Sequence, residues 1–85
     1  MGYEFSRDEL VGKPLTDAIQ ILQDEGWHWD ASDEKRVDSK HLWSILEPTK
    51  PLVDSNKVRV DEYVTLYSEL KNEQWVVIEA IEGAD

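Results

Sequence analysis

The most regular hydrophobic pattern in the chain lies in its first third. Between residues 15 and 25, apolar side chains recur at the i, i+3, i+4, i+7 spacing of one helix face: Leu15, Ala18, Ile19 and Leu22. Gly26 follows, and glycine adopts the left-handed conformation of a helix C-terminal cap at little cost. The pattern predicts an amphipathic helix over residues 15–25, with Trp27 packed back against it.

A weaker helical signal precedes this helix. Ser6 and Glu9 have the spacing of a capping box, and Phe5 and Leu10 have that of the accompanying hydrophobic staple. Gly12, which a proline follows closely, limits the segment. We therefore expect one short helical turn before the main helix.

The segment after the main helix alternates between apolar and polar residues. Trp27, Trp29 and Ala31 point to one side of an extended chain, which predicts a half-buried strand. The next stretch, residues 32–40, is highly charged. We expect it to be a loop.

Residues 39–46 have the pattern of a short helix. Leu42, Ile45 and Leu46 form an apolar stripe, and Asp38 or Ser39 is suited to cap the N-terminus. A proline at position 48 must end such a helix. The two prolines within residues 47–51 predict an extended, exposed segment there.

The last third of the chain predicts a β-hairpin. Residues 58–67 are rich in β-branched and aromatic side chains, and residues 75–81 form a nearly continuous apolar run. If both are strands, residues 68–74 form the loop between them. A helix over residues 58–70 is an alternative, because apolar residues also recur there with a 3.6-residue period: Val60, Tyr63, Val64, Tyr67 and Leu70.

These elements predict one domain over residues 1–85. The fold class is α+β, with one main helix packed on a small, mostly antiparallel sheet and a C-terminal hairpin. We expect Trp27, Trp75 and Trp29 to fill the core of a chain this short. An unpaired edge near residues 76–78 leaves both a monomer and a dimer open.

The charge of the chain predicts what kind of partner the domain binds. The formal net charge is −10. Residues 1–34 carry nine acidic and two basic side chains, residues 35–59 three and six, and residues 60–85 seven and one. Such a field attracts basic protein surfaces and repels nucleic acids and anionic membranes. We expect a basic protein partner, with no direct binding to nucleic acid or membrane.

The sequence assembles no catalytic or metal-binding motif. His28 and His41 are the two histidines, and no second ligand stands at a metal-motif spacing from either. No cysteine is present, which excludes disulfides and thiolate sites. No phosphate-binding glycine loop or nucleophile elbow occurs. We expect a non-enzymatic protein without a cofactor, and the absence of a signal-peptide pattern suggests the cytoplasm.

The expected function is therefore binding. Carboxylates arrayed like phosphates can cover a basic, even a nucleic-acid-binding, surface of a partner, as an inhibitor or adaptor does. Trp43 falls off the apolar stripe of its predicted helix, which marks it as an exposed anchor. The candidate partner-binding residues are Asp24, Glu25, Asp30, Asp33, Glu34, Trp43, Asp61, Glu62 and Glu69.

Two short segments carry resemblances to known families. Residues 9–13, with Ala18 and Ile21, and the segment 56–60 resemble the potato inhibitor I family of serine-protease inhibitors. That resemblance implies an inhibitory loop over residues 47–55 that includes Thr49, Lys50 and Pro51. The stretch from Val11 to Gly26 is about equally similar to PASTA domains, which implies a module that binds cell-wall fragments.

Overall fold

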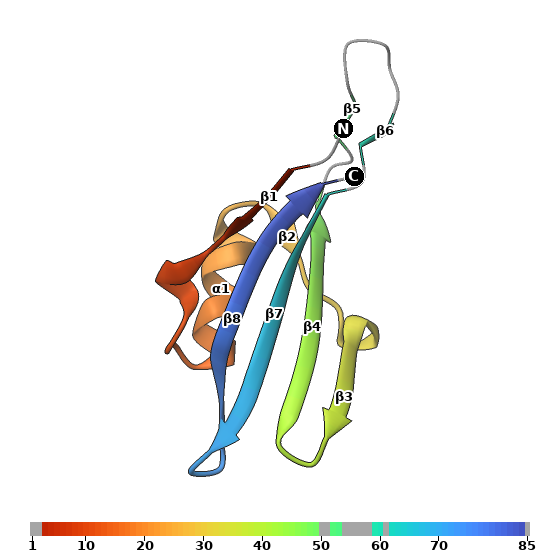
Figure 1. The fold of residues 1–85 in the computed structure, drawn as a ribbon. Helices are drawn as coiled ribbons and strands as arrows, with labels where there is room; N and C mark the ends of the chain where they lie inside the picture. The colour runs from red at the N-terminus through yellow and green to blue at the C-terminus, as the bar shows by residue number, and fades with distance from the viewer. Residues whose placement is uncertain (1–2, 50–51, 54–58, 61, 85) are drawn as a thin grey trace.

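The computed structural model describes residues 3–49, 52–53, 59–60 and 62–84. One α-helix packs on a mostly antiparallel sheet whose last two strands form a hairpin, which confirms the predicted fold class (Figure 1). No helix among these residues is long and apolar enough to cross a bilayer. In chain order the elements are β1 (Tyr3–Ser6), η1 (Asp8–Leu10), α1 (Leu15–Asp24), β2 (Trp27–His28), η2 (Ala31–Asp33), β3 (Glu34–Asp38), β4 (His41–Pro48), β5 (Leu52–Val53), β6 (Arg59–Val60), β7 (Glu62–Lys71) and β8 (Gln74–Ala84).

The main sheet has the strand order β1-β8-β7-β4-β2, and β3 also pairs with β4. All of its strand pairs are antiparallel. β5 and β6 pair separately and extend beyond one end of the sheet (Figure 1). The β4–β7–β8 strands therefore form the centre of the domain, with β1 on one side and β2 and β3 on the other.

Helix α1 agrees closely with its prediction. Its apolar face is buried through Leu15, Ala18 and Leu22, and the helix contacts β2 and β8. Gly26 has a φ of +101°, so it ends the helix in the left-handed conformation that glycine adopts readily. Trp27 follows directly and is 9% exposed within the same core. The spacing of apolar residues thus determined both the helix and the face that it buries.

The C-terminal hairpin is also confirmed, and the helical alternative for residues 58–70 is wrong. Val64, Leu66 and Ser68 are buried on one face of β7, which shows the two-residue period of a strand. The predicted loop over residues 68–74 is too long, because pairing continues to Lys71 and Gln74. The turn is only Asn72 and Glu73, at φ values of 51° and 65°. Such a two-residue turn matches the twist of the strands that it joins.

The structure overturns the helix predicted over residues 39–46 and the loop predicted over residues 32–40. Residues 34–46 belong to a second hairpin, in which β3 and β4 pair around a turn at Ser39 and Lys40, and residues 32 and 33 belong to η2. Leu42, Ser44 and Leu46 are buried on one face of β4. A short apolar run fits a helix and a strand equally, and pairing with β7 on the other side of β4 selects the strand.

The N-terminal capping box does not form. Ser6 lies in β1 opposite Ile81, and Glu9 pairs with the side chain of Arg7. The short helical turn itself is present as η1, but no side chain caps it. Phe5 is 47% exposed and stacks on Tyr3. Pairing of the first strand with β8 outweighs the local capping signal.

The strand predicted over Trp27, Trp29 and Ala31 is correct only at its start. β2 spans Trp27 and His28, and Ala31 already belongs to η2. The Asp30 carboxylate accepts a hydrogen bond from the Ser32 backbone N–H at 2.9 Å. This local bond offers the backbone a turn in place of a strand.

The edge predicted near residues 76–78 is not free. The Gly12 N–H donates to the Val77 carbonyl at 2.8 Å, and the Val77 N–H donates to the Lys13 carbonyl at 2.9 Å. A bridge between Pro14 and Val76 extends this contact beyond β1. The segment that leads into α1 therefore covers the outer edge of β8 at Val76 and Val77.

Arg7 joins three parts of the chain that are distant in sequence. Its guanidinium pairs with Glu9 at 2.5 Å, with Glu25 after α1 at 2.8 Å and with Glu82 in β8 at 2.8 Å. The side chains of Arg7 and Glu82 are only 11% and 14% exposed. The hydrogen bond from Arg7 lowers the pKa of Glu9 below its ordinary value. This cluster fixes the N-terminal segment and the end of the helix against the sheet.

The turn residue Glu73 provides a first test of the fold. Glu73→Gly should raise the free energy of unfolding by about 0.5–1 kcal/mol, because glycine accepts a positive φ without a Cβ clash. The urea midpoint measures this change. Lys71→Gly is the matched control in the adjoining strand and should lower stability by roughly the same amount. A lower midpoint for Glu73→Gly would contradict the observed turn.

Arg7 provides a second test. Arg7→Met should lower the free energy of unfolding by about 2 kcal/mol at neutral pH, because Glu82 loses its partner in a mostly buried position. Lys13→Met removes the same charge outside the cluster and should cost much less. The lowered pKa of Glu9 means that its part of this stability is present above pH 4.5, its ordinary pKa, and is lost as the pH falls through the lower folded value. Equal urea midpoints for the two variants would show that the cluster is not stabilising.

Candidate functional site

The face of the sheet opposite α1 carries no helix in the described part of the chain (Figure 1). Side chains that alternate with the buried ones point to this side from β4, β7 and β8. We call it the open face and define its centre by Trp43, Ile45, Thr65, Tyr67, Glu79 and Ile81. Antiparallel sheets commonly leave one face to solvent, and this one has an exposed tryptophan at its centre.

Aromatic side chains dominate the centre of the open face. Trp43 is 42% exposed and meets Tyr67 edge to face, with ring centres 6.3 Å apart. His41 stacks on the same tyrosine at 5.9 Å. Tyr67 therefore contacts both the imidazole and the exposed indole.

A hollow of about 240 Å³ adjoins this aromatic pair. Its walls are Trp43, Thr65, Tyr67 and Ile81, and the carboxylate-bearing side chain at its rim is Glu79. Glu79 lies directly opposite Tyr67 in the β7–β8 pair, and Tyr67 lies opposite Trp43. The hollow thus combines two aromatic rings with one negative charge.

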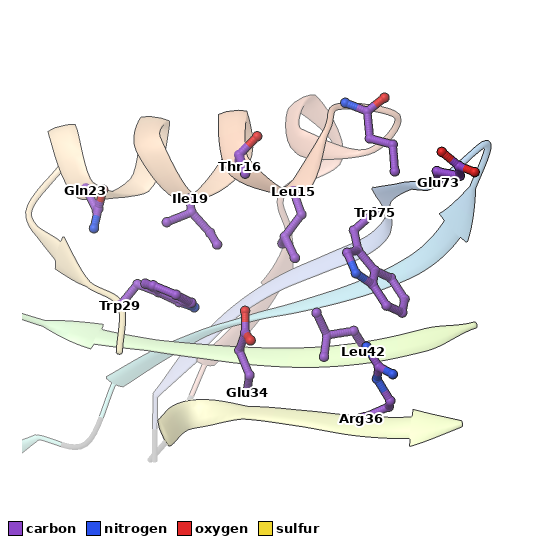
Figure 2. A pocket seen from close by; sticks show the side chains of 11 residues that line it. Leu15, Thr16, Ile19, Gln23, Trp29, Glu34, Arg36, Leu42, Glu73 and Trp75 are labelled. Atoms are coloured by element: carbon purple, nitrogen blue, oxygen red, sulfur yellow. The ribbon is translucent and has the colours of Figure 1, made fainter. Parts of the chain in front are cut away.

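A larger groove lies on the other side of the sheet, beside the helix. It has a volume of about 570 Å³ and runs between α1 and the β3–β4 hairpin (Figure 2). We call it the helix-side groove and define it by Leu15, Ile19, Trp29, Glu34, Arg36, Leu42 and Trp75. It exists because the helix covers the sheet above β8 but leaves part of β3 and β4 exposed on that face.

The acidic residues predicted near the end of α1 have different local surroundings. Asp24 accepts a hydrogen bond from Gln20, and Glu25 is held by Arg7. Asp30 caps η2, and its hydrogen bonds with Ser32 lower its pKa. Asp33 is partly buried in η2. These carboxylates are engaged locally, mostly in capping or pairing.

The remaining predicted residues divide between several places. Trp43 and Glu69 lie on the open face, where Glu69 stands opposite His41. Glu34 lines the helix-side groove. Glu62 accepts a hydrogen bond from the Tyr3 hydroxyl, and this bond raises the pKa of Tyr3 to about 12. Asp61 lies outside the described residues.

The loop implied by the protease-inhibitor resemblance is described only in part. Thr49 is exposed, and both its N–H and its hydroxyl donate to the Gly26 carbonyl at 2.9 Å. Lys50 and Pro51 lie outside the described residues. The structure therefore shows how the start of this segment is anchored to the end of α1.

Several residues of the two surfaces were not among the predicted ones. Tyr67 and Glu79 belong to strands, and their positions in the open face follow only from strand register. Arg36 and Trp75 lie together in the groove, with the guanidinium 5.6 Å from the ring centre. The alternation in residues 62–71 was the available signal for Tyr67. No signal marked Arg36, because its segment was predicted to be a loop.

The comparisons with known proteins identify no relative. No protein-family model, no curated protein and no solved structure matches the chain. The resemblances to potato inhibitor I and PASTA domains therefore stay predictions. Among the residues that the structure describes, no group of three or more histidine, aspartate or glutamate side chains is placed to hold a metal ion.

Proposed function

We propose that this chain is a non-enzymatic binding domain that holds a basic segment of a partner protein against its open face. The observation that carries the proposal is the hollow between Trp43 and Tyr67, with Glu79 at its rim. Covering a basic surface in this way is what an inhibitor or an adaptor does.

The chemistry of the hollow suits an arginine or lysine side chain. Cations are attracted to the faces of tryptophan and tyrosine rings, and the apolar stem of the side chain packs against Thr65 and Ile81. Glu79 is exposed and forms no ion pair among the described residues, so its carboxylate is free to pair with the incoming charge. An exposed tryptophan of this kind is typical of an interface hot spot.

The surrounding charge supports the same partner. The net charge of −10 attracts basic proteins over a distance. Within the open face, charge changes sign across the sheet, because Lys35 lies opposite Trp43 on β3 while Glu79 lies on β8. A partner's positive charge is therefore favoured at the β8 side of the aromatic pair and repelled at the β3 side.

The proposal can be tested with a short arginine-rich peptide as the probe. Titration of the complete chain, followed by tryptophan fluorescence and calorimetry, should show binding that weakens as salt is raised. Glu79→Gln and Trp43→Ser should each weaken it about tenfold, because each removes one partner of the bound cation.

Asp17→Asn is the matched control for this experiment. It removes the same charge from the solvent side of α1, on the opposite layer of the domain. It should change the affinity by less than about twofold, as expected for a screened, distant charge. If Asp17→Asn and Glu79→Gln weaken binding equally, the peptide senses only net charge, and the open face is not the site.

A further inference from the structure

The helix-side groove is a second surface, separate from the open face. Leu15 and Ile19 project from α1, and Leu42 faces them from β4 (Figure 2). Trp29 stands at one end of the groove and Trp75 at the other (Figure 2). Its volume of about 570 Å³ is within the range of pockets that bury a small organic ligand.

Two opposite charges face this apolar space from the same side of β3. Glu34 and Arg36 are two positions apart in the strand, opposite the buried residues Ser44 and Leu42. Neither side chain forms an ion pair within the described part of the chain. The Arg36 guanidinium lies over the Trp75 ring, and Glu34 points toward the helix beside Trp29 (Figure 2). The carboxylate and the guanidinium are thus held apart at the edge of the groove.

The indole of Trp29 provides a spectroscopic probe of the groove. Its Nε1 is buried and has no acceptor among the described residues. The nitrogen lies at the end of the ring that projects into the groove (Figure 2). Because Trp29 lines this end of the groove, its indole N–H signal reports on a ligand that binds there.

We propose that the helix-side groove binds a small zwitterion with a large apolar side chain, such as a free apolar amino acid. The ammonium group pairs with Glu34, the carboxylate pairs with Arg36, and the side chain packs between Leu15, Ile19 and Leu42. A purely anionic ligand is opposed by Glu34 and by the net charge of the chain. A purely cationic ligand leaves Arg36 without a partner and is repelled by it.

The test compares three ligands with one apolar body and different charges: L-phenylalanine, 2-phenylethylamine and 3-phenylpropionate. In ¹H–¹⁵N spectra the chain gives one indole N–H signal for each of its four tryptophans, and Trp29→Phe identifies the one of interest. L-Phenylalanine should shift the Trp29 signal and bind about tenfold more tightly than either analogue. No shift of that signal up to roughly 10 mM, or equal binding of all three, would overturn the proposal.

Substitutions of Glu34 and Arg36 test which charged group of the ligand each residue binds. Glu34→Gln should reduce the affinity for L-phenylalanine and 2-phenylethylamine, whereas Arg36→Gln should reduce it for L-phenylalanine and 3-phenylpropionate. Lys35→Gln is the matched control, because Lys35 lies between these residues but faces the open side, opposite Trp43. It should leave all three affinities unchanged, and a loss equal to that of Arg36→Gln would exclude the groove. Preserved dispersion of the spectra shows that each variant is folded.

Discussion

A single ten-residue helix has to cover a sheet whose path is five strands wide, and most of the structure follows from that mismatch. Such a helix is about 15 Å long and about 10 Å across. Five strands about 4.8 Å apart make a sheet roughly twice as wide as the helix is across. The helix can therefore bury only part of one face. The uncovered part of that face becomes the helix-side groove, and the opposite face stays open.

The sequence predicted the elements whose stability is mainly local. The helix over residues 15–25 has its apolar stripe and its terminal glycine in consecutive residues, so a short window of sequence contains the whole signal. The structure of residues 39–46 is not determined by local sequence alone. Their apolar run fits either a helix or a strand, and the choice depends on β7, about twenty-five positions further along the chain. No local pattern contains the information that this distant strand supplies.

The exposure of Trp43 was predicted correctly from the wrong element. On a helix it falls off the apolar stripe, and on a strand it alternates with Leu42 and Ser44, so both interpretations expose it. The positions of the carboxylates could not be predicted in the same way. The face of the sheet on which a carboxylate lies depends on the register of its strand. A bulge in β8 at the level of Tyr67 and Ser68 shifts the register of the β7–β8 pair. Glu79 was missed because its segment was read as one buried run.

Strand β3 contributes side chains to both surfaces. Lys35 and Arg36 are adjacent in sequence, yet the alternation of a strand sends one to the open face and the other into the groove. The basic middle of the sequence therefore contributes one cation to each layer at the same edge of the sheet. On the open face Lys35 lies across the aromatic pair from Glu79, and in the groove Arg36 lies two positions along β3 from Glu34. One short, charged strand thus places a different set of charges on each face of the sheet.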